Sequence, residues 1–240
     1  MHQPKIMGVD YDGAWAEYVA VPYPTLCSIP DSLPFEQAAL MADAIGTPYA
    51  ALVDTARLRP SQSVGLWGIG GLGFHAVQIA LLCGAAPVIA IDPRPSARQR
   101  ALDVGADAAL DPLHPDFDEL ILSLTDGLGL DLAVDFVGSN HVLRQADASL
   151  ARGGKVMIVG LTQDDIHLGS SERFGIGRHQ LLGSLGYKRR HLEQVANLVR
   201  RGRLGLSQLV SATYSLRDIE KGIAHLTSPS SDAVRIVILP

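Results

Sequence analysis

An apolar run at residues 63–67, SVGLW, passes directly into a glycine cluster, Gly68-Ile69-Gly70-Gly71-Leu72-Gly73. Residues 71–82 then follow a helical pattern, and residues 88–91, VIAI, form a second short apolar run. This order predicts strand, turn, helix and strand in succession. A parallel strand is buried on both faces and its crossover helix on one, which explains why no Asp, Glu, Lys or Arg occurs between Arg59 and Asp92.

A charge-free stretch of this length raises the question of a membrane span, which needs about 20 consecutive apolar residues. The glycines and Pro87 divide the stretch into pieces that are too short to form such a helix. We therefore expect no membrane-spanning segment.

The glycines at positions 68, 70 and 73 have the spacing G-x-G-x-x-G. Between a strand and a helix, the first allows a tight turn, the second lets the backbone approach a pyrophosphate, and the third lets the helix pack closely on the strand. The helix N-terminus adds unpaired N–H groups and a partial positive charge. We predict a dinucleotide site, with the alternative that the turn only packs. Its expected contacts are Gly68, Gly70, Gly71, Leu72 and Gly73.

Asp92 closes the second strand, where this motif places a carboxylate for the ribose hydroxyls. A carboxylate that accepts hydrogen bonds from the ribose diol would repel a 2′-phosphate at the same place. The sequence therefore favours NAD over NADP as the cofactor. Arg94 and Arg98 follow closely, and they are either contacts for a phosphate or members of a solvated first helical turn.

Strands and helices continue to alternate beyond Asp92. We expect strands at residues 108–110, 132–136, 156–160 and 181–185, helices at residues 96–104, 115–125, 141–150 and 192–201, and an irregular loop before the last strand. Such alternation predicts an α/β fold with a doubly wound, parallel, six-stranded sheet, whose ligand lies beyond the C-terminal ends of the strands. Val137-Gly138 and Gly160-Leu161 follow two of these ends, and we expect them to face the adenosine and nicotinamide portions respectively.

Composition and charge exclude some classes of binding partner and indicate the cell compartment. The 240 residues carry 20 Lys+Arg and 25 Asp+Glu, a net charge of −5. The basic residues are outnumbered and scattered, so we expect no nucleic-acid partner. Cys27 and Cys83 match no disulfide or C-x-x-C framework, and the N-terminus lacks a signal-peptide pattern. The sequence therefore predicts a cytoplasmic protein.

Residues 55–204 contain the predicted sheet, and shorter segments flank it. Residues 1–54 include an apolar helical segment at 35–53, and residues 205–240 include a helix at 216–226 and a strand at 234–239. Neither flank is large enough to fold alone. We predict that residues 1–54 and 205–240 pack together as one partial domain, which the sheet domain at 55–204 interrupts.

Several segments resemble the medium-chain dehydrogenase/reductase superfamily, and within it the zinc-type alcohol dehydrogenases. They are the glycine turn, Asp12-Gly13-Ala14-Trp15-Ala16-Glu17-Tyr18, Asp43-Ala44-Ile45-Gly46-Thr47-Pro48-Tyr49 and Gly105-Ala106-Asp107. The resemblance implies a Rossmann domain inserted in a GroES-like catalytic domain, here only partial. It also implies NAD(P)-dependent interconversion of small-molecule alcohols with aldehydes or ketones, and commonly a catalytic zinc.

On this resemblance, Asp43 stands where the family has its third protein ligand to zinc, usually Cys but Asp in a subset. Thr47 stands where the family contacts the nicotinamide. The other interpretation of Asp43 is a cap for a helix that starts near Ala44. The family's other ligands, from a Cys segment and a Gly-His-Glu segment, have no counterpart in this sequence. Catalytic zinc generally needs three protein ligands, so we do not expect this chain alone to hold zinc.

Three functions remain open. The first is an NAD-dependent oxidoreductase of the zinc alcohol dehydrogenase type, as a fragment or a shortened relative, that transfers hydride between nicotinamide and an alcohol or carbonyl compound. The second is a zinc-independent enzyme like the quinone or enoyl reductases. The third is a non-catalytic NAD-binding module or partner subunit. The resemblance also implies a homodimer, in which the strand at 181–185 extends the sheet across a two-fold axis.

Overall fold

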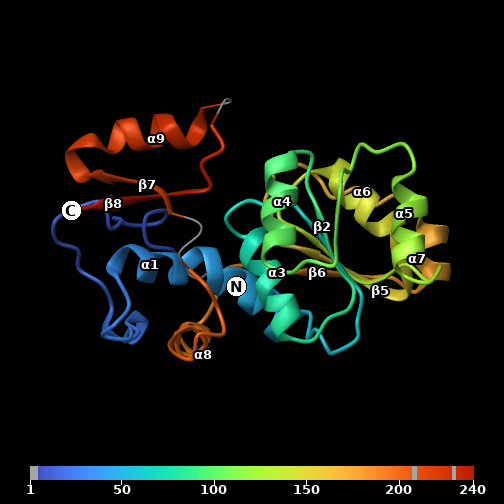
Figure 1. Ribbon diagram of the computed structural model, residues 1–240, viewed down its shortest axis with the longest axis horizontal. Coiled ribbons are helices and arrows are strands. Elements are labelled where there is room, and N and C mark those ends of the chain that lie inside the picture. Colours follow the sequence, from blue (N-terminus) through green and yellow to red (C-terminus); the bar gives the residue numbers. More distant parts are fainter. Residues whose placement is uncertain (1–4, 207–209, 229–230) are drawn as a thin grey trace. The chain divides into compact units, whose positions relative to one another are not determined.

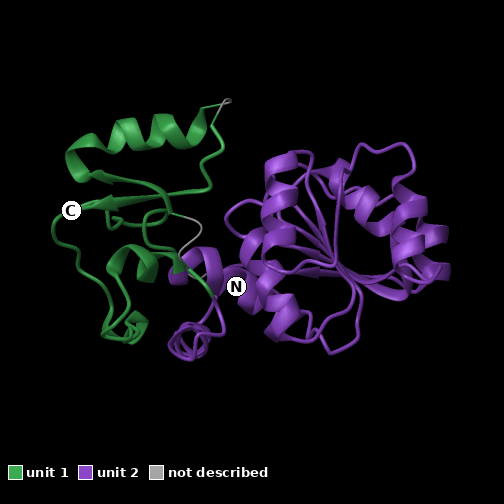
Figure 2. Cartoon of the chain, viewed as in Figure 1, with its two compact units in different colours: residues 1–40, 205–240 green, residues 41–204 purple. Residues whose placement is uncertain are grey.

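The computed structural model describes residues 5–206, 210–228 and 231–240. The chain forms two compact units (Figure 2). Unit 1 comprises Met1–Leu40 and Gly205–Pro240, and unit 2 comprises Met41–Leu204.

Unit 2 is built on one six-stranded parallel sheet with the order β3-β2-β1-β4-β5-β6. The strands are β1 (Val64–Trp67), β2 (Val88–Ile91), β3 (Ala108–Leu110), β4 (Leu130–Asp135), β5 (Leu150–Ile158) and β6 (Gln180–Gly183). The helices are α3 (Gly73–Leu82), α4 (Pro95–Asp103), α5 (Phe117–Leu124), α6 (Asn140–Ala148), α7 (Ser171–Gly177) and α8 (Arg189–Arg200). The predicted doubly wound parallel sheet is confirmed.

Helices cover both faces of this sheet. Figure 1 shows α3 and α4 on one side, and α5, α6 and α7 on the other. Every residue of β1 and β2 is buried, as expected for central strands between two helical layers. The strand order reverses between β1 and β4, and ligands of such sheets bind at this reversal, beyond the C-terminal ends of the strands.

The core beneath α5 and α6 is centred on Trp67. Its indole ring lies 6.3 Å from the Phe117 ring, centroid to centroid. Its Nε1–H donates to Gln145 Oε1 at 2.9 Å, so the one polar atom of this side chain is satisfied although the ring is buried. Ile89 and Ile91 of β2 pack into the same cluster. The core therefore joins β1, β2, α5 and α6.

The residue 35–53 segment is helical, as expected, but it is not one regular helix. It comprises α1 (Phe35–Leu40), a π-helical turn η2 (Met41–Ile45), α2 (Gly46–Tyr49) and a second π-helical turn η3 (Ala50–Thr55). Asp43 lies inside η2 rather than before a helix. The interpretation of Asp43 as a cap for a helix starting near Ala44 is therefore wrong.

Two elements were not expected from the sequence. Helix α7 lies within the predicted irregular loop, and Ser170 caps it by accepting a hydrogen bond from the Arg173 N–H at 3.5 Å. Strand β7 (Val210–Ser215) is the other. It pairs in parallel with β8 (Arg235–Leu239), and η4 (Leu216–Asp218) and α9 (Ile219–Thr227) connect the two strands. Unit 1 thus contains a small β-α-β motif.

The boundary between the units falls after Leu40. Residues 41–54 belong to unit 2 because η2 and α2 pack against α3 and α8. The sequence-based boundary after residue 54 is therefore placed too late.

Unit 1 also contains a short 3₁₀ turn, η1 (Tyr23–Thr25), and α1 lies against β8 within it. Its assignment as a partial GroES-like domain stays a prediction. None of the helices in the described residues has the length and apolar character needed to cross a bilayer.

The buried centre of β2 gives a direct test of this packing. We expect Ile89→Ala to lower the free energy of unfolding by about 2–5 kcal/mol, because it leaves a cavity between two helical layers. Urea denaturation measures this change. The control is Leu128→Ala, because that side chain is 74% exposed and its loss should change stability by less than about 0.5 kcal/mol. Equal effects of the two substitutions would contradict the described core.

Candidate dinucleotide-binding site

The glycine turn connects the C-terminal end of β1 to the N-terminus of α3. The Gly68 N–H donates to the Ile91 carbonyl at 2.8 Å, which ties the start of the turn to β2. Gly68 has a φ of +88°, a conformation that side chains rarely adopt. A Cβ on Gly73 would overlap the Gly68 carbonyl oxygen. Glycine at these two positions therefore lets α3 begin directly against the strand end.

The outer side of the turn is open. A Cβ on Gly70 would meet no atom within 4 Å. Leu72 immediately precedes α3 and Gly71 lies beside it, so both belong to the end of the helix that carries unpaired N–H groups. The turn thus presents backbone, rather than side chains, to whatever lies beyond the strands.

Asp92 stands immediately after β2 and braces the same turn. Its Oδ2 accepts a hydrogen bond from the Ile69 N–H at 2.8 Å, and the side chain is only 3% exposed. Arg94 covers this carboxylate, with Nε 3.1 Å from Oδ1 and Nη2 3.3 Å from Oδ2. The predicted ribose-binding carboxylate therefore lies at the glycine turn, with an arginine side chain over it.

The loops after β4 and β5 meet at the neighbouring strand ends. A Cβ on Gly138 would lie 2.8 Å from the Leu161 nitrogen, and a Cβ on Gly68 would lie 2.8 Å from Val137 Cγ2. Gly160 packs still more closely, because its added Cβ would overlap the Gly138 nitrogen. The structure therefore brings together the predicted residues Gly68, Val137, Gly138, Gly160 and Leu161 from three separate loops.

Asp135, which the sequence analysis did not identify, holds these loops in place. Its Oδ1 accepts from the Val137 N–H at 2.7 Å and from the Gly138 N–H at 3.0 Å. Its main-chain carbonyl accepts from the N–H groups of Val159 and Gly160, at 2.9 and 2.8 Å. The signal for this role in the sequence is an aspartate at the end of a buried apolar strand, directly before a short loop.

The Asp135 side chain is fully buried, and its Oδ2 has no hydrogen-bond partner among the described residues. Burial raises the pKa of Asp135 above its ordinary value of 3.8, although hydrogen bonds from the backbone at Gly138, Val137 and Ser139 oppose the rise. Burial thus favours the neutral form of this carboxyl group.

Asp43 and Thr47 lie together on the η2–α2 segment. The Thr47 hydroxyl donates to Asp43 Oδ1 at 3.3 Å, and Thr47 is buried. The Tyr187 ring packs on this segment, 2.9 Å from where a Cβ on Gly46 would lie. Burial raises the pKa of Tyr187, and the nearby charge of Asp43 adds to the rise. Tyr187 follows β6 in a loop that carries no recognisable motif, so no sequence signal distinguishes it.

The described residues do not provide a zinc site. Residues 5–206, 210–228 and 231–240 contain no group of three or more His, Cys, Asp or Glu side chains that could hold a metal ion. Asp43 is a suitable oxygen ligand, but one carboxylate does not complete a catalytic zinc site.

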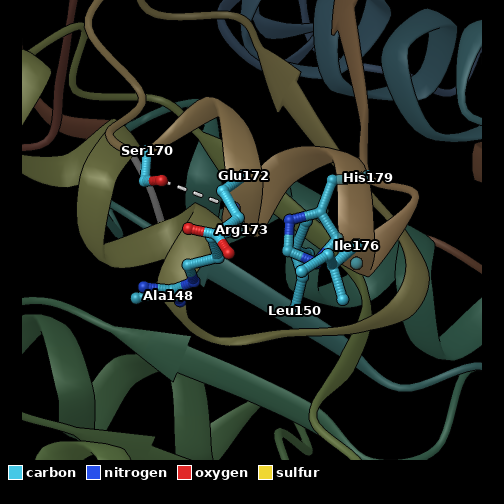
Figure 3. Close-up of a pocket in the computed structure, with 8 residues that line it drawn as sticks. Ala148, Leu150, Ser170, Glu172, Arg173, Ile176 and His179 are labelled. Atoms are coloured by element: carbon cyan, nitrogen blue, oxygen red, sulfur yellow. Dashed lines mark hydrogen bonds between the residues drawn. The ribbon is translucent and has the colours of Figure 1, made fainter.

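A cavity of about 460 Å³ lies at the opposite edge of the sheet (Figure 3). Its walls come from the end of α6, the start of β5, and α7, which are at the N-terminal ends of the strands. Beside it, His179 Nδ1 lies 2.7 Å from Asp147 Oδ1, and both side chains are buried. This pair links α6 to the segment after α7, so we interpret it as an anchor for α7 and not as part of the dinucleotide site.

Comparisons with known proteins show which family this chain resembles. A family model described as zinc-binding dehydrogenase matches residues 71–201. The L-threonine 3-dehydrogenase of Pyrococcus horikoshii is 32% identical over 216 residues, which cover 88% of this chain and 60% of that protein. The chain therefore spans less than two thirds of the length of this curated relative.

Solved structures also align over nearly the whole chain. The structure of an NAD-dependent alcohol dehydrogenase has a TM-score of 0.88 at 27% identity, and covers 98% of this chain and 68% of its own. A zinc-binding dehydrogenase from Sinorhizobium meliloti, bound to NADP, has a TM-score of 0.87 at 25% identity with the same two coverages.

The buried carboxyl group of Asp135 predicts a specific pH dependence of stability. Because the pKa of Asp135 is raised in the folded protein, the unfolded chain loses this proton first, and stability falls as pH rises from 3.8 towards the pKa of the folded state. Asp135→Asn lacks this contribution. As pH rises through this range, we expect the free energy of unfolding of the Asn variant to increase relative to that of the wild type. Urea denaturation at several pH values measures both.

Asp135→Ala provides the matched control. It removes the acceptor for two backbone N–H groups, and we expect it to destabilise the protein by about 2 kcal/mol or more at every pH. Identical pH dependence in wild type and Asp135→Asn would show that Asp135 titrates as an ordinary aspartate.

Proposed function

This chain belongs to the zinc-binding dehydrogenase family, and on that premise we propose that it binds NAD(H) and forms the dinucleotide-binding part of an alcohol dehydrogenase-type oxidoreductase. Family membership confirms the resemblance drawn from the sequence. The observation that carries the proposal is the open glycine turn between β1 and α3, braced by Asp92 at the end of β2.

The pyrophosphate would lie on the open side of the turn. In the part of the chain that the structure describes, no atom lies within 4 Å of a Cβ built on Gly70, and the N-terminus of α3 would offer N–H groups to a phosphate there. Phosphate oxygens accept hydrogen bonds from such groups, and the helix dipole favours their negative charge. The site thus has the shape and the electrostatic sign that a dinucleotide needs.

The remaining loops would orient the two ends of the cofactor. Val137 and Gly138 stand next to Gly68, and we assign them to the adenosine side, with Gly160 and Leu161 towards the nicotinamide. Thr47 is assigned to the nicotinamide side as well. When bound, the nicotinamide supplies hydride transfer to or from a substrate carbon. The Thr47 hydroxyl donates a hydrogen bond to Asp43 Oδ1, which orients its oxygen for a polar contact there.

We propose a small alcohol or carbonyl compound as the substrate class of the whole enzyme. The similar proteins are named as threonine and alcohol dehydrogenases, which supports this class. Because the described residues contain no metal-holding cluster, two alternatives remain, a zinc-independent reductase and a non-catalytic NAD-binding subunit. Turnover of alcohols with NAD by this chain would exclude the non-catalytic alternative, and stoichiometric zinc in the purified chain would exclude the zinc-independent one.

We further propose that the protein is a homodimer that pairs through β6. This strand is at the edge of the sheet, where it pairs with β5 on one side only. The Ser184 N–H donates to the Ile158 carbonyl in β5, and backbone groups of successive residues point to opposite sides of a strand. The backbone groups of Gly183 therefore point outward, where a second copy would bind them.

NADH binding tests the proposed site. Gly70→Ala places a methyl group where the pyrophosphate would lie, and we expect a loss of affinity of about tenfold or more, because hydrogen bonds to a charged group are worth about 1.5–3 kcal/mol. Titration of NADH followed by its fluorescence measures this loss.

Gly175→Ala is the matched control, because its added Cβ also meets no atom within 4 Å but lies on α7. It should bind NADH as the wild type does. Absence of saturable NADH binding by the wild type would overturn the proposed function. An unchanged NADH affinity of Gly70→Ala would show that the pyrophosphate does not lie on this turn.

Sedimentation velocity tests the dimer. Gly183→Pro removes one outward N–H from the exposed edge of β6 and leaves the Ser184 bond to β5 in place. We expect the wild type and Gly183→Ala to sediment as dimers and Gly183→Pro as a monomer. A monomeric wild type, or a dimeric Gly183→Pro, would contradict pairing through this edge.

A further inference from the structure

The cavity between α7 and the end of α6 has a histidine ring in its wall, and one nitrogen of this ring takes no part in the fold. His179 Nδ1 lies 2.7 Å from Asp147 Oδ1, and the two side chains are 5% and 3% exposed. The other ring nitrogen, Nε2, has no hydrogen-bond partner among the residues that the structure describes. Polar atoms of buried side chains are nearly always paired, so Nε2 is the group that a ligand in this cavity would bind.

Gly177 keeps this nitrogen uncovered. It also lines the cavity, and a Cβ at this position would overlap His179 Nε2. A larger residue at 177 would therefore push the ring away from Asp147 or fill the space beside Nε2. Glycine here leaves the imidazole both anchored to α6 and open to the cavity.

Two charged side chains of α7 complete the polar part of the wall. Glu172 and Arg173 both line the cavity, and neither has an ion-pair partner among the described residues. The Arg173 guanidinium donates one hydrogen bond within this part of the chain, from Nη2 to the Asp147 carbonyl at 3.4 Å. Because Asp147 and His179 balance one another, the cavity presents one unpaired positive charge and one unpaired negative charge.

The charges and the histidine lie at different ends of the cavity. In Figure 3, Glu172 and Arg173 are at one end, and Leu150, Ile176 and His179 are at the other. The aliphatic side chains of this second end give the imidazole apolar surroundings. The volume of about 460 Å³ falls in the range of about 300–1,000 Å³ that is typical of small-molecule sites.

We propose that this cavity is a second ligand site, which binds a small zwitterion of the α-amino acid type with an uncharged polar side chain. The ligand carboxylate accepts two N–H···O bonds from the Arg173 guanidinium, and the ligand ammonium group donates to Glu172. Its side chain extends between Leu150 and Ile176 and ends at His179. An amide or a hydroxyl group both donates and accepts, so it pairs with Nε2 whether or not the ring is protonated.

This site lies apart from the dinucleotide site. It is at the N-terminal ends of the strands, whereas the glycine turn and the loops that carry Val137 and Gly160 are at the C-terminal ends. Ligand binding in the cavity and NADH binding are therefore separate properties of the chain.

Calorimetric titration of the wild type with four small probes tests the ligand class. We expect saturable binding of L-glutamine. Glutaramate lacks its ammonium group and 4-aminobutanamide lacks its carboxylate, so each loses a charged contact and should bind about tenfold or more weakly. L-Norleucine replaces the amide by a hydrocarbon end, and it should also bind more weakly because it leaves Nε2 unpaired.

Substitutions on α7 test which charges are responsible. Glu172→Gln and Arg173→Gln should each weaken L-glutamine binding by about tenfold or more. Both residues are exposed, so these variants should fold. Arg217→Gln and Glu220→Gln remove the same charges from exposed positions in unit 1 and should leave L-glutamine binding unchanged.

A pair of glycine variants on α7 tests the role of Nε2. Gly177→Ala places a methyl group at this nitrogen and should remove the preference for L-glutamine over L-norleucine. Gly175→Ala adds a methyl group that meets no atom within 4 Å, so it should retain this preference.

Hydrogen–deuterium exchange locates the ligand. L-Glutamine should slow exchange in peptides that cover residues 171–180 and leave exchange at residues 68–74 unchanged. Absence of saturable L-glutamine binding, wild-type affinity in both Glu172→Gln and Arg173→Gln, or protection confined to other parts of the chain would overturn the proposed site. Each of these results would leave the proposed NADH binding intact.

Discussion

The close approach of Gly73 to the Gly68 carbonyl is the contact on which the arrangement of the site depends. A Cβ on Gly73 would overlap the Gly68 carbonyl oxygen, and Gly68 itself has a φ of +88°, so α3 begins directly at the end of β1 because both residues are glycine. This contact directs the helix N-terminus beyond the strand ends and leaves the space over Gly70 open. Without this contact the strand order would remain, but no open helix N-terminus would be available to bind a phosphate where the strand order reverses between β1 and β4.

Buried acids hold the rest of the site around this turn. Asp92 binds the Ile69 N–H at the end of β2, and Asp135 binds the loop after β4 through its side chain and the loop after β5 through its carbonyl. In both cases a carboxylate satisfies backbone N–H groups that would otherwise be buried and unpaired. The two acids differ in charge balance, because Arg94 neutralises Asp92, whereas burial alone raises the pKa of Asp135.

The sheet and its loops were predictable because their signals are local. Short apolar runs bounded by glycine identified β1 and β2, and the strand-end positions of Val137 and Gly160 followed from regular alternation. Helix α7 was missed although Ser170, Ser171 and Glu172 form a helix-start pattern, because the glycines that follow weakened it. The π-helical turn around Asp43 has no sequence signal that distinguishes it from an α-helix.

The contacts of Asp135 and Arg94 could not be predicted from the sequence, for a different reason. Each depends on which atoms a side chain meets after folding: the N–H groups of Val137 and Gly138 for one, and both oxygens of Asp92 for the other. Spacing along the chain placed Arg94 near the ribose position, but it left a phosphate contact and a solvated helical turn equally open. The two distances to the carboxylate show that Arg94 is paired with Asp92 in the folded chain.

Hydrogen–deuterium exchange with and without NADH tests most directly whether the loops beyond the C-terminal strand ends hold a dinucleotide. Bound NADH should slow exchange in peptides that cover residues 68–74, 92–94, 137–138 and 160–161. Exchange in α7 and beside the cavity at the opposite edge of the sheet should not change. Unchanged exchange at residues 68–74, or protection confined to α7, would show that the dinucleotide does not bind at these loops.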